Sequence, residues 1–169
     1  VQTCALPIFK IEGRMKTALY VATVARTYRK AIDDYLESPE KYRENLEWYR
    51  EEIGKCTYRE FTTGFYFGKP GSDTQIYDSS TYVKNYTYLG TVEETDGRGF
   101  GRIEQKNKFS VGETIEIMKP DGRNVEVTVK GIFREDGESQ ESAPHPQQVL
   151  FIDLDGQAEP YDILRKRED

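Results

Sequence analysis

The chain has 169 residues and a mass of 19.6 kDa, enough for one ordinary domain or for a small domain with a helical appendage. Its mean hydropathy is -0.77, and no apolar run approaches the roughly 18 to 20 residues of a membrane-spanning helix. The net charge of -6 lies mostly in residues 57–169, where 14 Lys and Arg face 21 Asp and Glu, which disfavours unspecific nucleic-acid binding by that half.

The first eight residues differ in character from those that follow. They have no signal-peptide charge, and their sequence resembles a translated sequencing adapter. We therefore expect residues 1–8 to be a non-native leader, with Cys4 an artefact and the native chain continuing upstream. The alternative is a short natural strand.

The apolar residues between Met15 and Leu36 recur at steps of three and four, which predicts an amphipathic helix. Ser38 then offers an N-cap, and the proline after it suits the first position of a second helix. Gly54 is placed to end that helix in a left-handed cap. The sequence therefore predicts two helices joined by a very short link.

After Cys56 the apolar period changes to two, and turns rich in Gly and Asp separate the apolar stretches. Six short strands with no helix between them predict a small antiparallel barrel or sandwich. We expect a long loop over Gly68–Val83 and a mobile hairpin insertion over Gly137–Gln147. The candidate strands are Thr57–Phe61, Tyr86–Glu94, Gly99–Gln105, Thr114–Met118, Asn124–Arg134 and Gln148–Leu154.

The densest candidate for chemistry is Phe9–Lys16, where a short apolar strand ends in a charged turn that opens a helix. Strand ends of this kind collect substrate groups in α/β barrels, and a helix N-terminus favours anions. Glu12 could orient a polar substrate and Arg14 could bind a phosphate or carboxylate, with Lys10 and Lys16 as secondary candidates. The alternatives are a structural Glu–Arg pair and an engineered cleavage tag, which the following helix disfavours.

The stretch Phe61–Pro70 combines aromatic residues, glycines and one lysine. It could stack bases of single-stranded RNA, although such stretches more often pack a small barrel against its neighbour. Residues 98–108 hold a concentration of basic residues in the acidic half. Three acidic pairs are expected to be solvated: Asp33-Asp34, Glu51-Glu52 and Glu93-Glu94.

Cysteine and histidine give no sign of a metal site or a nucleophilic centre. Cys4 and Cys56 form no metal-ligand spacing, so no metal ligands are predicted. The single His145 stands between two prolines, in a segment that we expect to be a loop with an exposed histidine. This chain alone therefore offers no set of nucleophile, histidine and acid.

Three segments together resemble the C-terminal portion of the peptidase U32 family: Lys10–Lys16, the helix from Tyr20 to Asp33, and Phe61–Phe65. Members of this family have a catalytic α/β barrel followed by a small β-barrel. The resemblance implies an α+β chain in which residues 9–56 are the last strand and C-terminal helices of a TIM-like barrel. Residues 57–169 would then be the C-terminal antiparallel β-barrel of about six strands.

The long form of the family is most similar to its bacterial tRNA hydroxylation branch. This implies a cytoplasmic protein that supports prephenate-dependent 5-hydroxylation of the tRNA wobble uridine. It also implies a [4Fe–4S] cluster, whose ligands would lie in an upstream catalytic domain, so residues 1–169 alone are expected to be inactive.

On this interpretation the β-barrel holds tRNA or docks onto the upstream catalytic barrel. Two alternatives remain open: a collagenase-like peptidase, as the family label suggests, and a structural or protein-docking barrel without a ligand. The cations expected to contact RNA are Lys69, Arg98, Arg102, Lys106 and Lys108.

Overall fold

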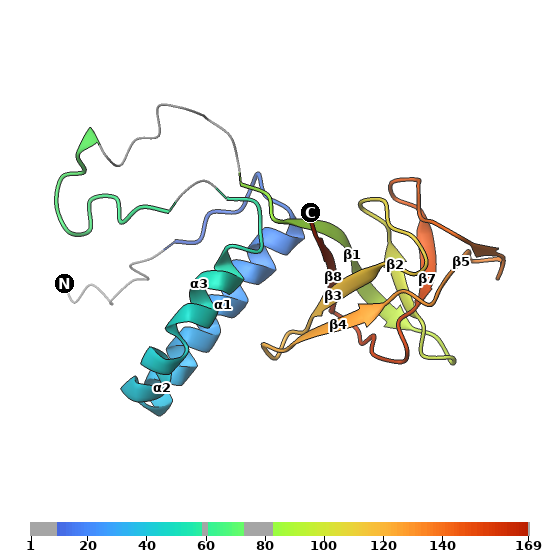
Figure 1. Ribbon diagram of the computed structural model, residues 1–169, viewed down its shortest axis with the longest axis horizontal. Coiled ribbons are helices and arrows are strands. Elements are labelled where there is room, and N and C mark those ends of the chain that lie inside the picture. Colours follow the sequence, from blue (N-terminus) through green and yellow to red (C-terminus); the bar gives the residue numbers. More distant parts are fainter. Residues whose placement is uncertain (1–9, 59–60, 73–82, 169) are drawn as a thin grey trace, which may run out of the picture.

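The structure, a computed structural model, describes residues 10–58, 61–72 and 83–168. A helical hairpin lies at one end of the molecule and a curled antiparallel sheet at the other (Figure 1). The predicted class, helices followed by a small antiparallel β-barrel-like domain, is confirmed. The predicted leader of residues 1–8 lies outside the described residues, as does most of the expected loop Gly68–Val83.

Helix α1 (Ala18–Glu37) and helix α2 (Pro39–Glu44) share Ser38 as a cap. The Ser38 N–H donates to the Asp34 carbonyl oxygen at 2.9 Å, which ends α1. The Ser38 Oγ accepts a hydrogen bond from the Lys41 N–H at 3.0 Å, which begins α2. The predicted cap is therefore confirmed, and one serine both ends a helix and starts the next.

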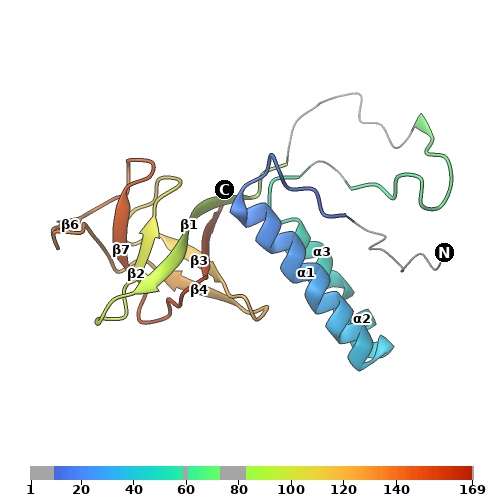
Figure 2. The ribbon, with the colours of Figure 1, turned by 180° about the vertical axis from the view of Figure 1, so that it is seen from behind.

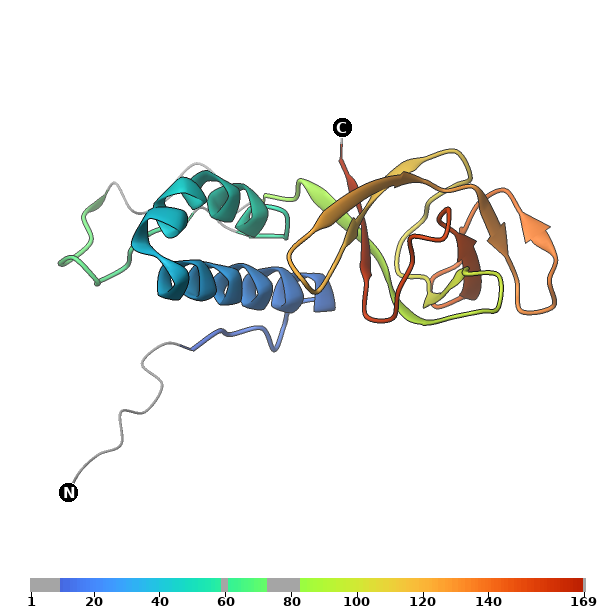
Figure 3. The same cartoon turned by 90° about the horizontal axis from the view of Figure 1, so that it is seen from below.

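The second predicted helix is divided into α2 and α3 (Leu46–Ile53). The chain leaves the helical conformation at Asn45, with φ -93° and ψ 5°, and the Asn45 Nδ2 donates to Asp34 Oδ2 at 3.0 Å. The left-handed cap predicted at Gly54 is wrong, because Gly54 keeps a right-handed φ of -76°. The two short helices run back along α1, as Figure 3 shows.

The buried side of α1 is more polar than the sequence predicts. Arg26 and Asp34 are buried there, whereas Ile32 and Leu36 are exposed. The buried polar side chains are tolerated because each finds hydrogen-bond partners on α3 or on the sheet. The predicted apolar stripe therefore packs only at its start, where Leu19 is buried, and its later members face solvent.

Within the described ranges, eight antiparallel strands form one sheet in the order β4-β3-β8-β1-β2-β7-β5-β6. The last strand in sequence, β8, lies between β3 and β1, near the centre of the sheet. The strands are β1 (Tyr86–Thr95), β2 (Gly101–Glu104), β3 (Thr114–Met118), β4 (Asn124–Thr128), β5 (Gly131–Phe133), β6 (Ser139–Gln140), β7 (Val149–Asp153) and β8 (Ile163–Arg167).

The long strand β1 pairs with β8 over its first part and with β2 over its second part, and the sheet curls along this strand. Its pairing register shifts between Tyr88 and Gly90 and again between Val92 and Glu94, and such irregularities bend a strand. At Gly90 a Cβ atom would lie 3.1 Å from the carbonyl oxygen of Glu104. A side chain at this position would push against the backbone of β2, so the close approach of the two strands favours glycine.

The described residues form eight strands, whereas the sequence predicts about six. The predicted strand Thr57–Phe61 is represented in the described residues only by an isolated bridge between Tyr58 and Val83. The predicted strand Asn124–Arg134 is two strands, because β4 pairs with β3 whereas β5 pairs with β7. Strands β6 and β8 are missing from the prediction.

The expected mobile insertion Gly137–Gln147 is tied to the sheet. It contains β6 and the fully buried Ala143, whose carbonyl oxygen accepts from Gln105 Nε2 at 2.8 Å. An isolated bridge between Ser110 and Ser142 holds it further. The loop therefore forms part of the barrel core, while His145 is exposed, as the sequence predicts.

The described side chains form two apolar clusters, and the smaller one joins the hairpin to the sheet. Leu19 and Val24 of α1 pack there with Cys56, Met118 of β3 and Ile163 of β8. Burial of such side chains stabilises the contact between the two parts. The larger cluster fills the curl of the sheet and consists of Leu89, Val92, Ile103, Phe109, Ile115, Ile117, Val127, Val129, Ile132, Ala143, Leu150, Ile152, Leu154, Ala158 and Leu164.

Candidate functional site

The charged turn predicted to be catalytic lies on the surface of the helical hairpin. The Arg14 backbone N–H donates to Glu12 Oε1 at 3.0 Å, and Lys10 Nζ lies 3.1 Å from Glu12 Oε2. These contacts hold the pKa of Glu12 below its usual value. The side chains of Glu12 and Arg14 both face solvent, and residues 10–13 form no strand. The described residues thus do not enclose the two groups in a site.

A mainly apolar hollow of about 550 Å³ lies beside this turn. Tyr20 and Val24 of α1, Ile53 of α3 and Phe61 line it, and the Glu12 turn contributes to its wall. Such a surface suits an apolar group with few polar contacts. The hollow extends from the predicted catalytic turn to the exposed part of α1.

Cys56 also lines the hollow but is only 1% exposed. Burial raises the pKa of the Cys56 thiol to about 11, and its Sγ lies 3.3 Å from the Ile53 carbonyl oxygen. At neutral pH the group is therefore a protonated thiol and a poor nucleophile or metal ligand.

Two of the cations predicted to bind RNA are paired with carboxylates on the sheet. Arg102 pairs with Glu93 and also lies 3.6 Å from Glu94, and Lys106 pairs with Glu104. Exposed pairs of this kind contribute at most about 1 kcal/mol, so a phosphate could displace the carboxylate. These ion pairs nevertheless neutralise Arg102 and Lys106, so they remove most of the net positive charge that the sequence suggests for this part of the sheet.

Arg98, a third predicted cation, belongs to a surface cluster with two aromatic rings. It donates to Asp96 Oδ2 at 2.8 Å, and its guanidinium lies 4.4 Å from the ring centre of Phe100. Phe100 and Phe133 stack with 5.2 Å between ring centres and 15° between planes. A Cβ at Gly131 would lie 2.7 Å from the Phe133 ring, so this ring needs a glycine beneath it. The sequence pattern does not predict this cluster, because its two rings come from different hairpins.

Lys69 and Lys108, the remaining predicted cations, lie in different parts of the molecule. Lys108 is exposed beside Ser110 and Ser142 of the sheet and forms no ion pair with another described residue. Lys69 belongs to residues 61–72, which lie on the side of the helices in both Figure 1 and Figure 2. The structure therefore does not bring all the predicted cations onto one face.

Glu52 of α3 is the centre of a buried ion network that the sequence analysis did not predict. It is 1% exposed, and its Oε1 accepts hydrogen bonds from Arg165 Nη2 at 2.6 Å and from Arg26. Its Oε2 accepts from Asn124 Nδ2 at 2.8 Å and lies 3.2 Å from Lys55 Nζ. The Glu52 carboxylate therefore connects helices α1 and α3 with strands β4 and β8.

Burial alone would raise the pKa of Glu52, but the charges of Arg165 and Arg26 lower it. Glu116 of β3 adds a second carboxylate, accepting from Arg165 Nε at 2.6 Å and lying 3.1 Å from Lys55 Nζ. The prediction that Glu51-Glu52 is solvated is therefore wrong for Glu52. It is also wrong for Asp34, which is buried against Tyr49.

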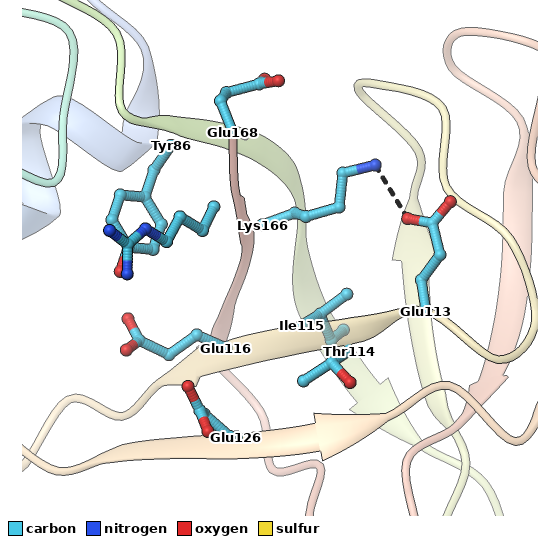
Figure 4. A pocket seen from close by; sticks show the side chains of 9 residues that line it. Tyr86, Glu113, Thr114, Ile115, Glu116, Glu126, Lys166 and Glu168 are labelled. Carbon is cyan, nitrogen blue, oxygen red and sulfur yellow. Dashed lines mark hydrogen bonds and ion pairs between the residues drawn. The ribbon is translucent and has the colours of Figure 1, made fainter.

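A second hollow, of about 590 Å³, lies on the outer face of β3, β4 and β8 (Figure 4). Four glutamates line it with only two cations, and Glu116 and Glu126 are directly opposite each other in the sheet. Lys166 Nζ donates to Glu113 at 2.8 Å, which neutralises one of the cations. The excess of carboxylates disfavours an RNA backbone on this face.

In the part of the chain that the structure describes, no three His, Cys, Asp or Glu side chains could hold a metal ion. The described residues do not fit an iron–sulfur cluster, since the one cysteine among them is buried and protonated. The iron–sulfur cluster that the family resemblance implies therefore remains a prediction about residues outside the described ranges. Within the same described ranges, no helix is both long and apolar enough to cross a membrane.

Two models of one protein family match the chain. The model "Peptidase family U32" matches residues 3–76, and the model "Peptidase family U32 C-terminal domain" matches residues 84–165. Together they include both the helical hairpin and the curled sheet. The chain therefore belongs to peptidase family U32.

Relatives within the family carry two kinds of name. tRNA hydroxylation protein P1 of Bacillus subtilis is 37% identical over 158 residues, which are 93% of this chain and 37% of that protein. tRNA hydroxylation protein P of Escherichia coli is 32% identical over 144 residues, covering 85% of this chain and 31% of that protein. Collagenase of Porphyromonas gingivalis is 30% identical over 116 residues, 67% of this chain and 32% of that protein. The chain thus spans about a third of the length of these relatives.

Among solved structures, the C-terminal domain of a U32-family protein from Geobacillus thermoleovorans is similar to part of the chain. The similarity covers 47% of this chain and 99% of that domain, with 28% sequence identity and a TM-score of 0.43.

Proposed function

We propose that this protein takes part in the hydroxylation of tRNA, with the curled sheet as a module that positions RNA or docks onto the catalytic domain. The observation that carries the proposal is the match to tRNA hydroxylation protein P1. That match extends over 93% of the chain, and so over both the hairpin and the sheet, whereas the match to a collagenase covers 67%.

The family resemblance extends this proposal to its chemistry. The reaction would be prephenate-dependent 5-hydroxylation of the wobble uridine, with a [4Fe–4S] cluster held by an upstream catalytic domain. Glu12 and Arg14 would contribute to the mouth of that domain, and Lys10 and Lys16 would support them. Cytoplasmic location belongs to the same proposal.

The buried network around Glu52 supports a positioning role for the sheet. It connects α1 and α3 with β3, β4 and β8 through hydrogen bonds that are out of water. A buried network fixes geometry when its members are satisfied, and among the described residues Arg26 Nε is the one buried side-chain polar atom of this network that lacks a hydrogen-bond partner. An RNA held on the sheet would therefore keep a fixed orientation relative to the hairpin and the Glu12 turn.

A chimera tests the proposed activity directly. The region of tRNA hydroxylation protein P1 that matches this chain is replaced by residues 9–169 and expressed in a strain lacking the relative. We expect 5-hydroxylated uridine to return in tRNA, measured by mass spectrometry of its nucleosides. A chimera that accumulates at the level of the parent protein but restores no hydroxylated uridine would contradict the proposal.

The same chimera tests the Glu12 turn. We expect Glu12→Gln and Arg14→Ala each to lower the content of hydroxylated uridine, by about tenfold if one charge-assisted hydrogen bond is lost. Glu37→Gln, at an exposed carboxylate on α1, is the control. Full activity of both variants would show that the turn only supports the fold.

The sheet cations are tested by tRNA binding at several salt concentrations. Replacing both Arg98 and Arg102 by alanine should weaken binding and reduce the slope of log K against log salt by about 1 to 2. Unchanged binding would exclude this patch and leave protein docking as the role of the sheet.

Peptidase activity is the second candidate function, because relatives named collagenase match the chain. Cleavage of gelatin by the full-length protein, lost on a point substitution in its catalytic domain, would favour it. Gelatin that stays intact while tRNA is hydroxylated would exclude it.

A further inference from the structure

The turn that follows Phe61 exposes three consecutive aromatic side chains. Phe65, Tyr66 and Phe67 are 79%, 71% and 81% exposed. The Tyr66 N–H donates to the Thr63 carbonyl oxygen at 3.0 Å, which closes the turn. We call residues 63–69 the aromatic turn. None of its three rings is covered by the described residues, so these rings do not pack the sheet against the helices.

The aromatic turn belongs to a long connection with a fixed start and end. Tyr58 and Val83 exchange two backbone hydrogen bonds, at 3.1 and 2.8 Å, where the connection leaves and rejoins the fold. Phe61 stacks on Tyr58 with 4.6 Å between ring centres and 4° between planes. Connections of this length are uncommon in compact domains, and when they occur they are usually functional or serve as linkers.

The charge of the aromatic turn differs from that of the sheet. Residues 61–72 contain Lys69 and no aspartate or glutamate. Lys69 is exposed and forms no ion pair with any residue that the structure describes, whereas Arg98, Arg102 and Lys106 pair with nearby carboxylates. Three exposed rings therefore lie next to a cation that none of the described carboxylates neutralises.

We propose that the aromatic turn binds unpaired nucleobases of an RNA strand. Its exposed rings stack on the bases, and Lys69 contacts a phosphate. This inference rests on the proposed function, because it names the part of the molecule that holds the tRNA substrate. Stacking on an aromatic ring tolerates any base, and unpaired bases are the parts of RNA that side chains reach most readily.

The ring geometry favours splayed bases over a regular helical stack. Tyr66 and Phe67 are arranged edge to face, with 5.0 Å between ring centres and 80° between planes. Two perpendicular rings stack on two bases only when those bases point in different directions. Bases of a single-stranded loop can do so, whereas bases of a duplex cannot.

Fluorescence anisotropy with the whole chain tests the inference, using a fluorescein-labelled oligouridylate and a labelled tRNA as probes. Phe65→Ala, Tyr66→Ala and Phe67→Ala should each raise Kd, by roughly 5- to 100-fold for a ring that stacks on a base. The control is Tyr161→Asn on the sheet side. Tyr161 is 77% exposed at a φ of 74°, a conformation that asparagine tolerates.

The salt dependence separates stacking from phosphate contact. Lys69→Gln should reduce the slope of log K against log salt by about 0.7, the value for one phosphate of a single strand. The three alanine variants should weaken binding without changing that slope. Circular dichroism checks that each variant keeps its fold, as we expect because the replaced rings are exposed.

The possible results separate the inference from the proposed function. If the unmodified chain binds tRNA and all three alanine variants bind equally well, the inference is overturned and the proposed function stands. If the unmodified chain binds neither probe at low salt, the inference and the RNA-positioning role of this chain both fail. Weaker binding by the alanine variants with an unchanged Tyr161→Asn control supports the inference.

Discussion

Glu52 of α3 and Arg165 of β8 form a buried ion pair across the boundary between the helical hairpin and the sheet. Glu52 Oε1 lies 2.6 Å from Arg165 Nη2, and neither residue is more than 1% exposed. The two lie 113 residues apart in the chain and fall in different family models, one matching residues 3–76 and the other residues 84–165. The two matched regions are therefore joined through a contact that excludes water.

The Glu52→Gln substitution should destabilise the protein by about 3 to 5 kcal/mol. It removes the carboxylate that pairs with the buried Arg26, while Arg165 keeps Glu116 as a partner. The buried guanidinium of Arg26 is then left without a paired carboxylate, and an uncompensated buried charge is costly. The free energy of unfolding, measured by urea denaturation, gives the difference.

Glu51→Gln is the matched control for this substitution. Glu51 is the preceding residue on α3 and is exposed, so its replacement should change stability by less than about 0.5 kcal/mol. Equal stability of the two variants would show that the Glu52 network contributes nothing net to folding.

The Tyr49→Phe substitution should cost about 1.5 to 3 kcal/mol of stability. The Tyr49 hydroxyl donates to Asp34 Oδ2 at 2.6 Å in a buried setting, and hydrogen bonds to charged groups have this magnitude. Tyr42→Phe is the control, since its ring stacks on Tyr49 with 5.6 Å between centres and is retained. Thermal unfolding of both variants should show a lower Tm for Tyr49→Phe alone.

Acid should destabilise the protein partly through Asp34. Burial tends to raise the pKa of Asp34, but hydrogen bonds from Tyr49, Lys30 and Asn45 lower it to about 2 in the folded state. Because the folded pKa is below the unfolded value near 4, the stabilisation is present above about pH 4 and is lost as the pH falls through about 2. The shift corresponds to about 2 kcal/mol.

The contribution of Asp34 is isolated by comparing two proteins at two pH values. Between about pH 5 and about pH 2, the free energy of unfolding of the unmodified chain should fall by about 2 kcal/mol more than that of Asp34→Asn. Parallel pH profiles for the two proteins would rule out a shifted pKa for Asp34.

The Gly131→Ala substitution should disrupt the Arg98 cluster on the sheet. The added Cβ would lie 2.7 Å from the Phe133 ring, which must then move away from Phe100. Overpacking of this kind costs about 1 to 3 kcal/mol. Gly97→Ala is the control, because no atom lies within 4 Å of its Cβ. Equal urea midpoints for the two variants would contradict the packing described for Phe133.

Local signals in the sequence were sufficient for the helices and for most strands. The Ser38 cap depends on residues three or four positions away, and a pattern of that range can be recognised in a single sequence. Strand β8 was missed because Ile163–Arg167 ends in three cations, and a run of charge at the end of a short strand predicts a solvated segment. Only the distant Glu52 and Glu116 make Arg165 a core residue.

The candidate sites were less predictable than the fold. The Glu12 turn was recognisable as a charged turn, but whether it is enclosed depends on residues that pack around it. The pairing of Arg102 with Glu93 depends on the register of β1 and β2. The exposure of Phe65 and Tyr66 depends on which surfaces the rest of the chain covers, and no local pattern reports that.

The central place of β8 has a consequence for synthesis on the ribosome. Strands β1 and β3 both pair with β8, so they expose open backbone edges to solvent and chaperones until residues 163–167 have left the exit tunnel. The ion network around the buried Glu52 of the hairpin is likewise incomplete until Arg165 is available. Folding of both parts should therefore finish in one late step, and a ribosome stalled shortly before residue 163 should present a nascent chain that proteases cut readily.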